Sequence, residues 1–385
     1  MTDERRLLAR TAEIAADFID SLDTRPVPAR GSVGELRVAL ARPLPQNPTD
    51  PVSVIEELAA AGELGVVGIP SGRYFGFVIG GAVPAALAAD WLASTWDQNA
   101  GLYACGPSAS VVEEVVGDWL KQLLGIPAHA SFALVTGCQM AHATCLAAAR
   151  NAVLADVGWN VEEAGLATAP PIRVLAGAKR HATIDRALRL LGLGTGSIAE
   201  IAADGQGRMD IARLSAALAE SAGPTIVCAQ LGEVNTGSFD AAREIADVLE
   251  GTGAWLHVDG AFGLWAAASD AHAHLVNGHD RADSWTTDAH KWLNVPYDCG
   301  IAFVAHPERH RAAMTVRADY LVQARMPSAT RSTGRPSSRA APAASPCTRH
   351  SGRSGGAASR TSSTAAAGTP SASARDLRSF RAARS

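Results

Sequence analysis

From residue 131 onward, short apolar runs alternate with segments of helical periodicity. The runs are FALVTG, IRVLAGAK, TIVCAQLGE and AWLHVDGAFG, and helical segments such as MAHATCLAAARNAVLA and AAREIADVLEGTG lie between them. Strands that alternate with helices in this way form βαβ units, whose strands are parallel. The pattern therefore predicts an α/β domain with a mostly parallel sheet. Because ligands of such sheets bind beyond the carboxyl ends of the strands, we expect functional residues just after the apolar runs.

The segments outside this region suggest how the 385-residue chain is divided. Helical spacing is followed by a proline-rich stretch that predicts an extended arm, and three more helical patterns precede residue 131. These four helical patterns cover 5–22, 54–64, 83–96 and 110–124. After residue 325 the chain is rich in Ser, Ala, Arg, Pro and Gly, and such a segment cannot bury enough apolar surface to become ordered. The predicted parts are an N-terminal helix and arm at 1–52, a large domain at 53–322 and a disordered tail at 323–385.

Composition excludes several classes of protein. The chain is 47% hydrophobic and 19% charged, which is typical of a large buried core rather than of disorder or a coiled coil. Residues 1–325 carry a net charge of −13, so we expect no nucleic-acid partner. The N-terminus lacks the apolar core of a signal peptide, and no apolar stretch is long enough to span a bilayer. Six cysteines without a CxxC pair favour free thiols, and we expect a soluble cytoplasmic protein.

An acid and a lysine follow two of the apolar segments. Asp259 ends the run AWLHVD, and the small Gly260 and Ala261 after it leave room for a flat ring. Lys291, one of only three lysines, comes next to His290. A partly desolvated lysine has a lowered pKa and forms a Schiff base with an aldehyde, while an acid keeps a pyridine nitrogen protonated. The two residues together predict a pyridoxal-phosphate site.

Other features of the pattern are less specific. The turn at 136–139 precedes a helix expected to begin near Met140, so it is either an ordinary connection or an anion seat at a helix N-terminus. His181 follows another apolar run and is either a solvated loop residue or a ring-stacking imidazole. His272, His274 and His279 match no zinc motif, so we interpret them as solvated loop residues and expect no metal site.

Two segments resemble motifs of the pyridoxal-phosphate-dependent group II decarboxylases, the family of aromatic amino-acid, histidine and glutamate decarboxylases. HVDGAFG at 257–263 is similar to the family's HVDAAYGG, and DSWTTDAHKWLNVPYDCG at 283–300 is similar to its DS-x-x-x-D-x-HKW-x-x-x-P-x-DCG signature. The resemblance extends from about residue 50 to 322. It implies the large domain of a fold type I, aspartate aminotransferase-like enzyme, which acts as a homodimer. It also implies that Lys291 is the aldimine lysine, with His290 beside it, and that Asp259 is the partner of the pyridinium nitrogen.

The resemblance extends to further site residues. It implies that His181 stacks on the cofactor ring and also acts in catalysis, and that Ala261 packs on the opposite face. TGCQMAH at 136–142 is similar to the family's SGGSEAN phosphate loop, but Cys138 and Gln139 replace smaller or hydroxyl residues, and His142 replaces Asn or Thr. The implied phosphate contacts are Gly137, Cys138 and Gln139, and the turn GEVNTGSFD adds Asn235 and Thr236 as cofactor contacts. The segment GRYFGFVIGG places Phe77, Val78 and Ile79 at the substrate pocket.

The implied activity is removal of the α-carboxylate of an amino acid as CO₂. In the family a tyrosine on a mobile loop protonates the product, but no Tyr follows Tyr320 here, and the C-terminal small domain has no counterpart. We therefore hypothesise that the tail is an out-of-frame reading of the gene, which would impair activity. The alternatives are an aminotransferase and a non-catalytic remnant that binds the cofactor. The sequence does not identify the amino acid, although Phe77 and Tyr103 would suit an aromatic one.

Overall fold

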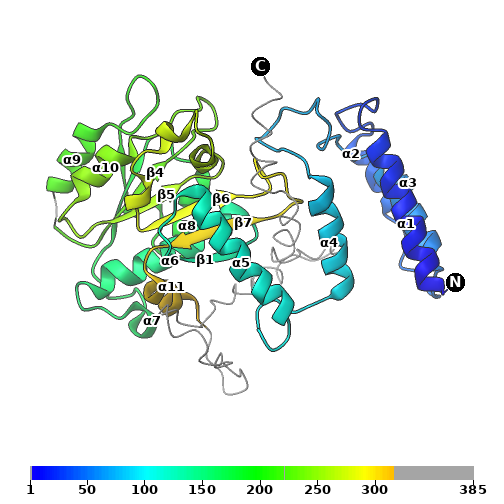
Figure 1. Ribbon diagram of the computed structural model, residues 1–385, viewed down its shortest axis with the longest axis horizontal. Coiled ribbons are helices and arrows are strands. Elements are labelled where there is room, and N and C mark those ends of the chain that lie inside the picture. Colours follow the sequence, from blue (N-terminus) through cyan, green and yellow to red (C-terminus); the bar gives the residue numbers. More distant parts are fainter. Residues whose placement is uncertain (1, 221, 316–385) are drawn as a thin grey trace. The chain divides into compact units, whose positions relative to one another are not determined.

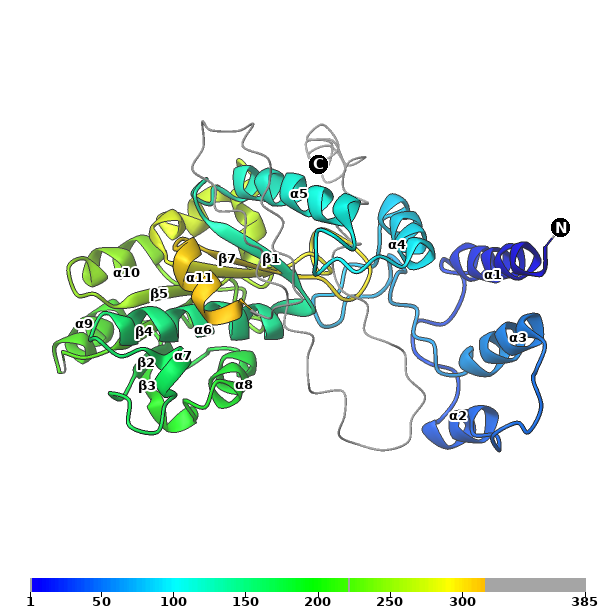
Figure 2. The same cartoon turned by 90° about the horizontal axis from the view of Figure 1, so that it is seen from below.

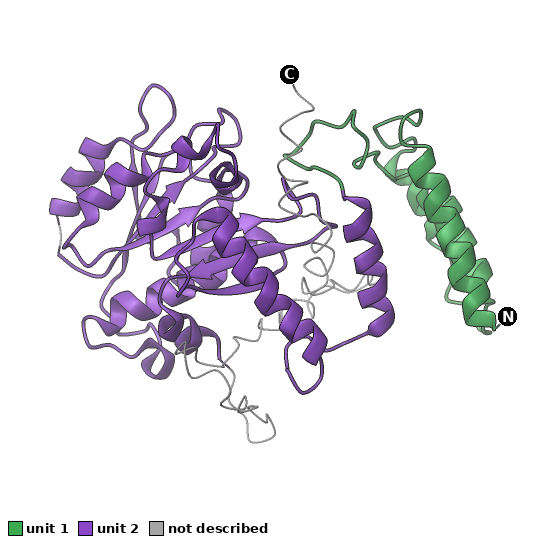
Figure 3. Cartoon of the chain, viewed as in Figure 1, with its two compact units in different colours: residues 1–81 green, residues 82–385 purple. Residues whose placement is uncertain are grey.

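The computed structural model describes residues 2–220 and 222–315 (Figure 1). The chain forms two compact units, Met1–Gly81 and Ala82–Ser385 (Figure 3). The boundaries expected at residues 52 and 322 stay predictions. The expected disorder of 323–385, the missing small domain and the frameshift hypothesis concern a segment outside the described residues.

The first unit consists of three helices, α1 (Asp3–Asp20), α2 (Val33–Leu40) and α3 (Pro51–Gly62). The prediction of a fully extended arm is wrong, because α2 lies within it. A capping box begins α2: Ser32 Oγ accepts the Glu35 N–H at 3.2 Å, and the Glu35 carboxylate accepts the Ser32 N–H at 2.8 Å. Each bond satisfies a backbone donor that would otherwise lack a partner, so the helix forms between the flanking prolines.

The second unit is built on a seven-stranded sheet with the order β1-β7-β6-β5-β4-β2-β3. Its strands are β1 (Ser131–Val135), β2 (Arg173–Gly177), β3 (Ile198–Ile201), β4 (Thr225–Gln230), β5 (Trp255–Asp259), β6 (Ser284–Asp288) and β7 (Gly300–Val304). Only β7 is antiparallel to its neighbours, β1 and β6. The other pairs are parallel, which confirms the prediction of a mostly parallel sheet.

Helices cover both faces of this sheet, and Figure 2 shows α5 and α6 on opposite sides. Alternate residues of each strand point to different cores: Leu134 packs in the cluster that includes α5, and Ala133 and Val135 pack in the cluster that includes α6. The α-helices of this unit are α4 (Pro84–Trp96), α5 (Pro107–Leu124), α6 (Gly137–Ala155), α7 (Val161–Ala164), α8 (Ala182–Leu190), α9 (Ile211–Ala219), α10 (Ala242–Leu249) and α11 (Pro307–Met314). The 3₁₀ segments are η1 (Thr195–Ser197), η2 (Gly263–Ala268), η3 (Ala273–Val276) and η4 (His279–Arg281).

Helix α6 runs along the sheet and is buried over most of its length. Its many alanines allow this close packing because they add little volume between helix and strands. The helix begins at Gly137, earlier than the expected start near Met140. Gly137, Cys138 and Gln139 therefore form its first turn, where backbone N–H groups point away from the helix. Among the described residues, no helix is both long and apolar enough to cross a membrane.

Candidate active site at the carboxyl ends of β5 and β6

Two acids end neighbouring strands of the sheet. Asp259 is the last residue of β5 and Asp288 the last of β6, and the two strands pair in parallel with Asp259 opposite Thr286. Lys291 follows Asp288 by three residues, and its Nζ lies 3.1 Å from Asp288 Oδ2. The fold therefore brings the predicted acid and the predicted lysine to the same edge of the sheet.

Asp288 connects the lysine to the start of α6. Its Oδ1 accepts the backbone N–H of Cys138 at 2.6 Å. His290 Nε2 lies 3.6 Å from Asp288 Oδ2, and His290 Nδ1 accepts the Cys299 N–H at 3.0 Å. The His290 ring also stacks on Tyr297 with centroids 4.1 Å apart. These contacts hold the segment after β6 against the N-terminus of α6.

The charges of this cluster follow from burial and from Asp288. Burial has the largest single effect on the pKa of Lys291 and lowers it, but the combined effect of Asp288 and the groups around it is greater and raises that pKa above its ordinary value. Desolvation acts in the predicted direction, but the pKa of Lys291 is not lowered overall in this arrangement. Burial lowers the pKa of His290, so its ring is neutral and its Nδ1 is an acceptor.

Asp259 is a buried carboxylate, with only 4% of its surface exposed. Its Oδ1 accepts the Ala261 N–H at 3.2 Å, and its Oδ2 lies 3.5 Å from His142 Nε2. Burial raises the pKa of Asp259, yet His142 and the Ala261 N–H together bring it well below the ordinary value. Asp259 is thus ionised in a site that excludes water.

The start of α6 requires glycine. Gly137 has φ +78°, and a Cβ there would lie 3.4 Å from His290 Cε1. Burial, followed by the charge of Asp288, raises the pKa of the Cys138 thiol well above its ordinary value. Cys138 is therefore a neutral thiol that offers its backbone, not a nucleophile.

The other predicted cofactor residues make local contacts. His181 is the exposed N-cap of α8, and its Nδ1 lies 2.8 Å from Thr183 Oγ1. Gln139 Nε2 donates to the Thr183 carbonyl at 3.4 Å, which joins the starts of α6 and α8. Asn235 is exposed, and its side-chain amide donates to Glu233 Oε1 at 2.6 Å.

Thr236 is likewise exposed and held by its own turn. Its N–H donates to Glu233 Oε2 at 2.7 Å, and its hydroxyl donates to Ser238 Oγ at 2.9 Å. The roles of His181, Gln139, Asn235 and Thr236 stay predictions.

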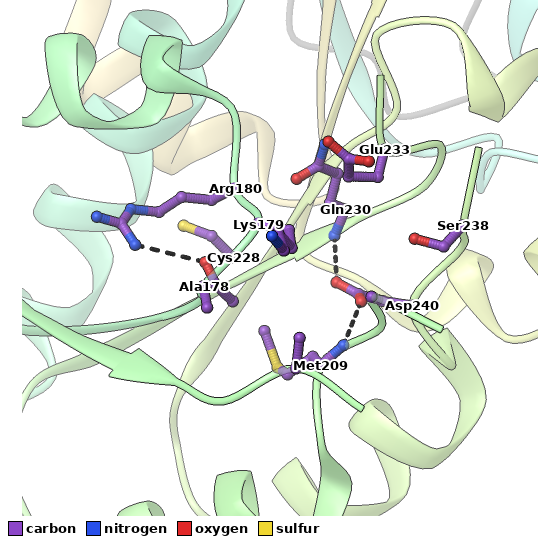
Figure 4. A pocket seen from close by; sticks show the side chains of 12 residues that line it. Ala178, Lys179, Arg180, Met209, Cys228, Gln230, Glu233, Ser238 and Asp240 are labelled. Atoms are coloured by element: carbon purple, nitrogen blue, oxygen red, sulfur yellow. Dashed lines mark hydrogen bonds between the residues drawn. The ribbon is translucent and has the colours of Figure 1, made fainter. Parts of the chain in front are cut away.

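A pocket that was not predicted lies beyond the ends of β2 and β4 (Figure 4). Lys179, Cys228 and Asp240 line it, and Asp240 accepts the backbone N–H groups of Met209 at 2.7 Å and Gln230 at 2.8 Å. Burial raises the pKa of Asp240. Because Gln230 pairs with Asp259 across β4 and β5, this pocket borders the acid end of the site.

The predicted substrate residues Phe77, Val78 and Ile79 belong to the first unit. Phe77 and Val78 have φ of +55° and +59°, and the Phe77 side chain is exposed. A positive φ in a β-branched residue is strained and often accompanies a functional constraint. The substrate role of this segment stays a prediction.

The three histidines considered for a metal site do not share one environment. His279 is buried: its Nε2 lies 2.8 Å from the Leu124 carbonyl oxygen and its Nδ1 lies 2.7 Å from that of Val276. The interpretation of His279 as a solvated loop residue is therefore wrong, and it instead ties η4 to the end of α5. Across 2–220 and 222–315, no group of three His, Cys, Asp or Glu side chains could hold a metal ion.

Three side chains of this site were not predicted to act in it: Asp288, His257 and His142. Asp288 carries a recognisable signal, because an acid three residues before a lysine places both on one side of a turn. His142 and His257 are separated by 115 residues in the sequence. His142 Nδ1 lies 2.9 Å from His257 Nε2 only because α6 packs on β5. The pattern of either segment alone does not reveal that contact.

Comparison with known proteins agrees with this geometry. A family model described as the pyridoxal-dependent decarboxylase conserved domain matches residues 34–341. An aromatic-L-amino-acid decarboxylase of Bacillus atrophaeus is 29% identical over 321 residues, covering 82% of this chain and 65% of that protein. An L-2,4-diaminobutyrate decarboxylase of Rhizobium meliloti is 35% identical over 246 residues, covering 62% of this chain and 46% of that protein.

Two solved structures are similar to this chain in fold. Oryza sativa TDC with PLP and tryptamine superposes with a TM-score of 0.75 and 26% identity, over 83% of this chain and 67% of that one. Mouse CSAD superposes with a TM-score of 0.74 and 26% identity, over 82% of this chain and 66% of that one. Because the family model matches 34–341, most of the chain, the protein belongs to the pyridoxal-dependent decarboxylase family.

Proposed function

We propose that this protein is a pyridoxal-phosphate-dependent carboxy-lyase that removes the α-carboxylate of an amino acid as CO₂. The chain spans about 65% of the length of the Bacillus relative. The observation that carries the proposal is the placement of the Lys291 amine, just after β6, at the same edge of the sheet as the buried, ionised Asp259 that ends the adjacent strand β5.

The residues present fit this cofactor. A buried carboxylate that stays ionised is the partner a protonated pyridine nitrogen requires, and Asp259 is such a group. Lys291 has 20% of its side chain exposed, so an aldehyde can reach its amine. The N-terminus of α6, which is 19 residues long, provides the positive end of a helix dipole for a phosphate, although the Cys138 N–H of its first turn donates to Asp288.

Each side chain then has a defined task. Asp288 Oδ2, 3.1 Å from Lys291 Nζ, is placed to accept the proton that the amine must lose before it reacts. Asp259 holds a proton on the ring nitrogen, and the burial of this carboxylate excludes competing water. When bound, pyridoxal phosphate supplies an electron sink for the electron pair that remains on the α-carbon after CO₂ leaves. The predicted catalytic role of His181 would be to hold the ring flat.

The test begins with the visible absorption of the purified protein mixed with pyridoxal phosphate, before and after borohydride reduction. We expect a band that reduction fixes covalently to the protein and that is absent from Lys291→Ala. The loaded protein is then given tryptophan, 2,4-diaminobutyrate, glutamate and histidine, and both CO₂ and keto acid are measured. CO₂ release supports the proposal, keto-acid formation identifies an aminotransferase, and a band without turnover identifies a non-catalytic cofactor-binding protein.

We also propose that the protein acts as a homodimer, as the family resemblance implies. An apolar stripe on α5, formed by Val111, Val115 and Trp119, supports this. These residues are spaced four apart, so they share one helix face, and they are 45%, 40% and 47% exposed. A second copy of the chain would remove this stripe from water.

We propose residence in the cytoplasm. The five cysteines within the described residues are all free thiols, which suits a reducing compartment. Fractionation of the native cells, with an antibody to the protein, tests this proposal.

A further inference from the structure

A buried chain of polar side chains leads from Asp259 into the core. His142 on α6, His257 on β5 and Ser284 on β6 are all 0% exposed. His142 Nε2 lies 3.5 Å from Asp259 Oδ2, and His142 Nδ1 lies 2.9 Å from His257 Nε2. His257 Nδ1 lies 2.9 Å from Ser284 Oγ, which accepts the Trp255 Nε1–H at 2.9 Å. The mechanism above leaves these groups without a task.

The protons of this chain are best followed from Asp259. An indole N–H can only donate, so Ser284 Oγ accepts from Trp255, and its second lone pair and its own proton allow it to accept from His257 Nδ1 or to donate to it. Burial lowers the pKa of His257 to about 3, so this ring is neutral and can carry its one proton on either nitrogen. At the other end, the Asp259 carboxylate favours a proton on His142 Nε2, the atom that faces it at 3.5 Å.

A second polar atom lies near the other ring nitrogen. Thr286 Oγ1 lies 3.4 Å from His142 Nδ1, and a hydroxyl can donate to this nitrogen or accept from it. A His142 ring without a proton on Nε2 would instead place a lone pair against the Asp259 carboxylate, and two electron-rich atoms would then face each other in a buried site.

His142 Nε2 is the unsatisfied member of the chain. It is buried and makes no hydrogen bond to any residue in 2–220 or 222–315, and Asp259 Oδ2 is its neighbour at 3.5 Å. An N–H placed beside a carboxylate stabilises the ionised form of that carboxylate and limits its rotation. The family motif has Asn or Thr at this position, so the contact between two histidines is a feature of this sequence.

We propose that His142 is a positioning residue: a proton on His142 Nε2, held beside the buried carboxylate, keeps Asp259 ionised and directed toward the ring nitrogen of the cofactor. The inference rests on the proposed function, because it takes pyridoxal phosphate as the ligand of Asp259. His142 itself touches neither substrate nor cofactor in this scheme.

The test compares two cofactors in binding titrations followed by absorbance. One is pyridoxal phosphate, and the other is 1-deazapyridoxal phosphate, in which carbon replaces the ring nitrogen. The variants are His142→Phe, which removes the donor, and His142→Gln, which restores an N–H. The matched control is His310→Phe, which removes another buried histidine, on α11, whose Nδ1 lies 2.9 Å from Ser131 Oγ.

We expect His142→Phe to weaken the binding of pyridoxal phosphate about tenfold or more and that of the deaza analogue less than threefold. His142→Gln recovers much of the loss, and His310→Phe leaves the ratio of the two dissociation constants unchanged. An equal loss for both cofactors means that His142 only supports the fold, and no loss for either means that it has no role. Both results overturn the inference while leaving the proposed function intact.

A measurement on the unmodified protein avoids the risk that a variant fails to fold. The ¹⁵N chemical shifts of the histidine rings in the cofactor-free protein distinguish the two neutral tautomers. We expect His142 to carry a proton on Nε2, and a proton on Nδ1 alone would overturn the inference. If the unmodified protein does not bind pyridoxal phosphate at all, the proposed function fails first and the inference fails with it.

Discussion

Asp288 controls the reactivity of Lys291 through one ion pair. The carboxylate 3.1 Å away strengthens the preference of the amine for its protonated form, and a protonated amine does not attack an aldehyde. The same carboxylate also accepts the Cys138 N–H. Asp288 therefore both fixes the start of α6 and sets the pH range in which the lysine reacts.

Asp288→Asn tests this double role. Asparagine retains an oxygen for the Cys138 N–H but loses the charge that raises the pKa of Lys291. We expect the pH profile for the rate of pyridoxal-phosphate attachment, followed by absorbance, to shift to lower pH. An unchanged profile would show that Asp288 does not hold the lysine proton. Asp283→Asn, which changes an acid bonded to His306 instead, is the control.

Gly300 allows β7 to approach the start of α6. A Cβ at residue 300 would lie 2.3 Å from the Gly137 carbonyl carbon, a backbone atom that cannot move alone. We expect Gly300→Ala to lower the free energy of unfolding by about 1–3 kcal/mol, as overpacked sites do, and to weaken cofactor binding. Urea unfolding measures the first effect. Gly196→Ala, where nothing lies within 4 Å, should stay within about 0.5 kcal/mol of the original protein.

A site residue could be predicted from the sequence only where its own segment carries a recognisable pattern. Lys291 and Asp259 were predictable because lysine is scarce in this chain and each follows an apolar or motif segment. The contacts of Asp288 with Cys138, and of His142 with His257, join residues 150 and 115 positions apart. Such contacts depend on how α6 packs across the sheet, and periodicity within one segment contains no information about them.

At the scale of elements, the loop between α5 and β1 is fastened by a buried lysine. Lys121 Nζ donates to the carbonyl oxygens of Ala128 at 3.0 Å and Ala130 at 3.2 Å, and it pairs with Asp118 at 3.1 Å. Two carbonyls and one carboxylate thus share a single ammonium group. The end of α5 is held to the first strand of the sheet by this group.

Lys121→Met keeps the apolar stem and removes the donor. We expect the free energy of unfolding to fall by about 1.5–3 kcal/mol, because carbonyls that accept from a charged group lose their partner. The partly exposed carboxylate matters less, so Asp118→Asn should cost no more than about 1 kcal/mol. Chemical denaturation of the unmodified protein and the two variants measures both changes. Equal losses of unfolding free energy in the two variants would contradict this account.

The strands and helices were predictable to different degrees. β1, β2, β4 and β5 are apolar runs separated by helices, and that alternation alone indicates a parallel arrangement. β7 is just as apolar but follows β6 after a short connection without a crossover helix, so it is antiparallel. α2 was not predicted, because the prolines on both sides favour an extended chain. The capping box of Ser32 and Glu35 was the local signal for this helix.

At the scale of the whole molecule, the free energy of unfolding depends on buried neutral histidines. Burial lowers the pKa of His310 to about 4 and that of His257 to about 3. The unfolded chain protonates both near pH 6.5, whereas the folded chain does not. Stability is therefore full above pH 6.5 and falls as the pH drops toward 4, at up to about 1.4 kcal/mol per pH unit for each histidine.

Urea unfolding of the cofactor-free protein at pH 7.5, 6.0 and 5.0 measures this slope. We expect His310→Phe to reduce the loss between pH 6.0 and 5.0, because one of the two titrating groups is gone. Its stability at pH 7.5 is compared separately, since the bond from His310 to Ser131 is also removed. The same slope in both proteins would show that His310 takes up its proton in the folded state as well.

The apolar stripe on α5 makes a prediction about assembly. Two copies that bury this stripe should separate when a charge is placed in it, because burying an unpaired carboxylate is costly. Sedimentation equilibrium is expected to give a dimer for the unmodified protein and a shift to monomer for Val115→Glu. Val157→Glu, at an exposed valine outside α5, should leave the dimer intact. A monomer from the unmodified protein would contradict the homodimer.

The strand order also has a consequence for synthesis on the ribosome. β1 is made first, but its partner in the sheet is β7, the last strand in the described chain. While residues 136–299 emerge, β1 has no strand beside it, and α6 has only part of the surface on which it will pack. A nascent chain therefore cannot close its sheet until Val304 has left the exit tunnel. Chaperones that shield an unpaired strand edge would have their longest period of contact with this segment.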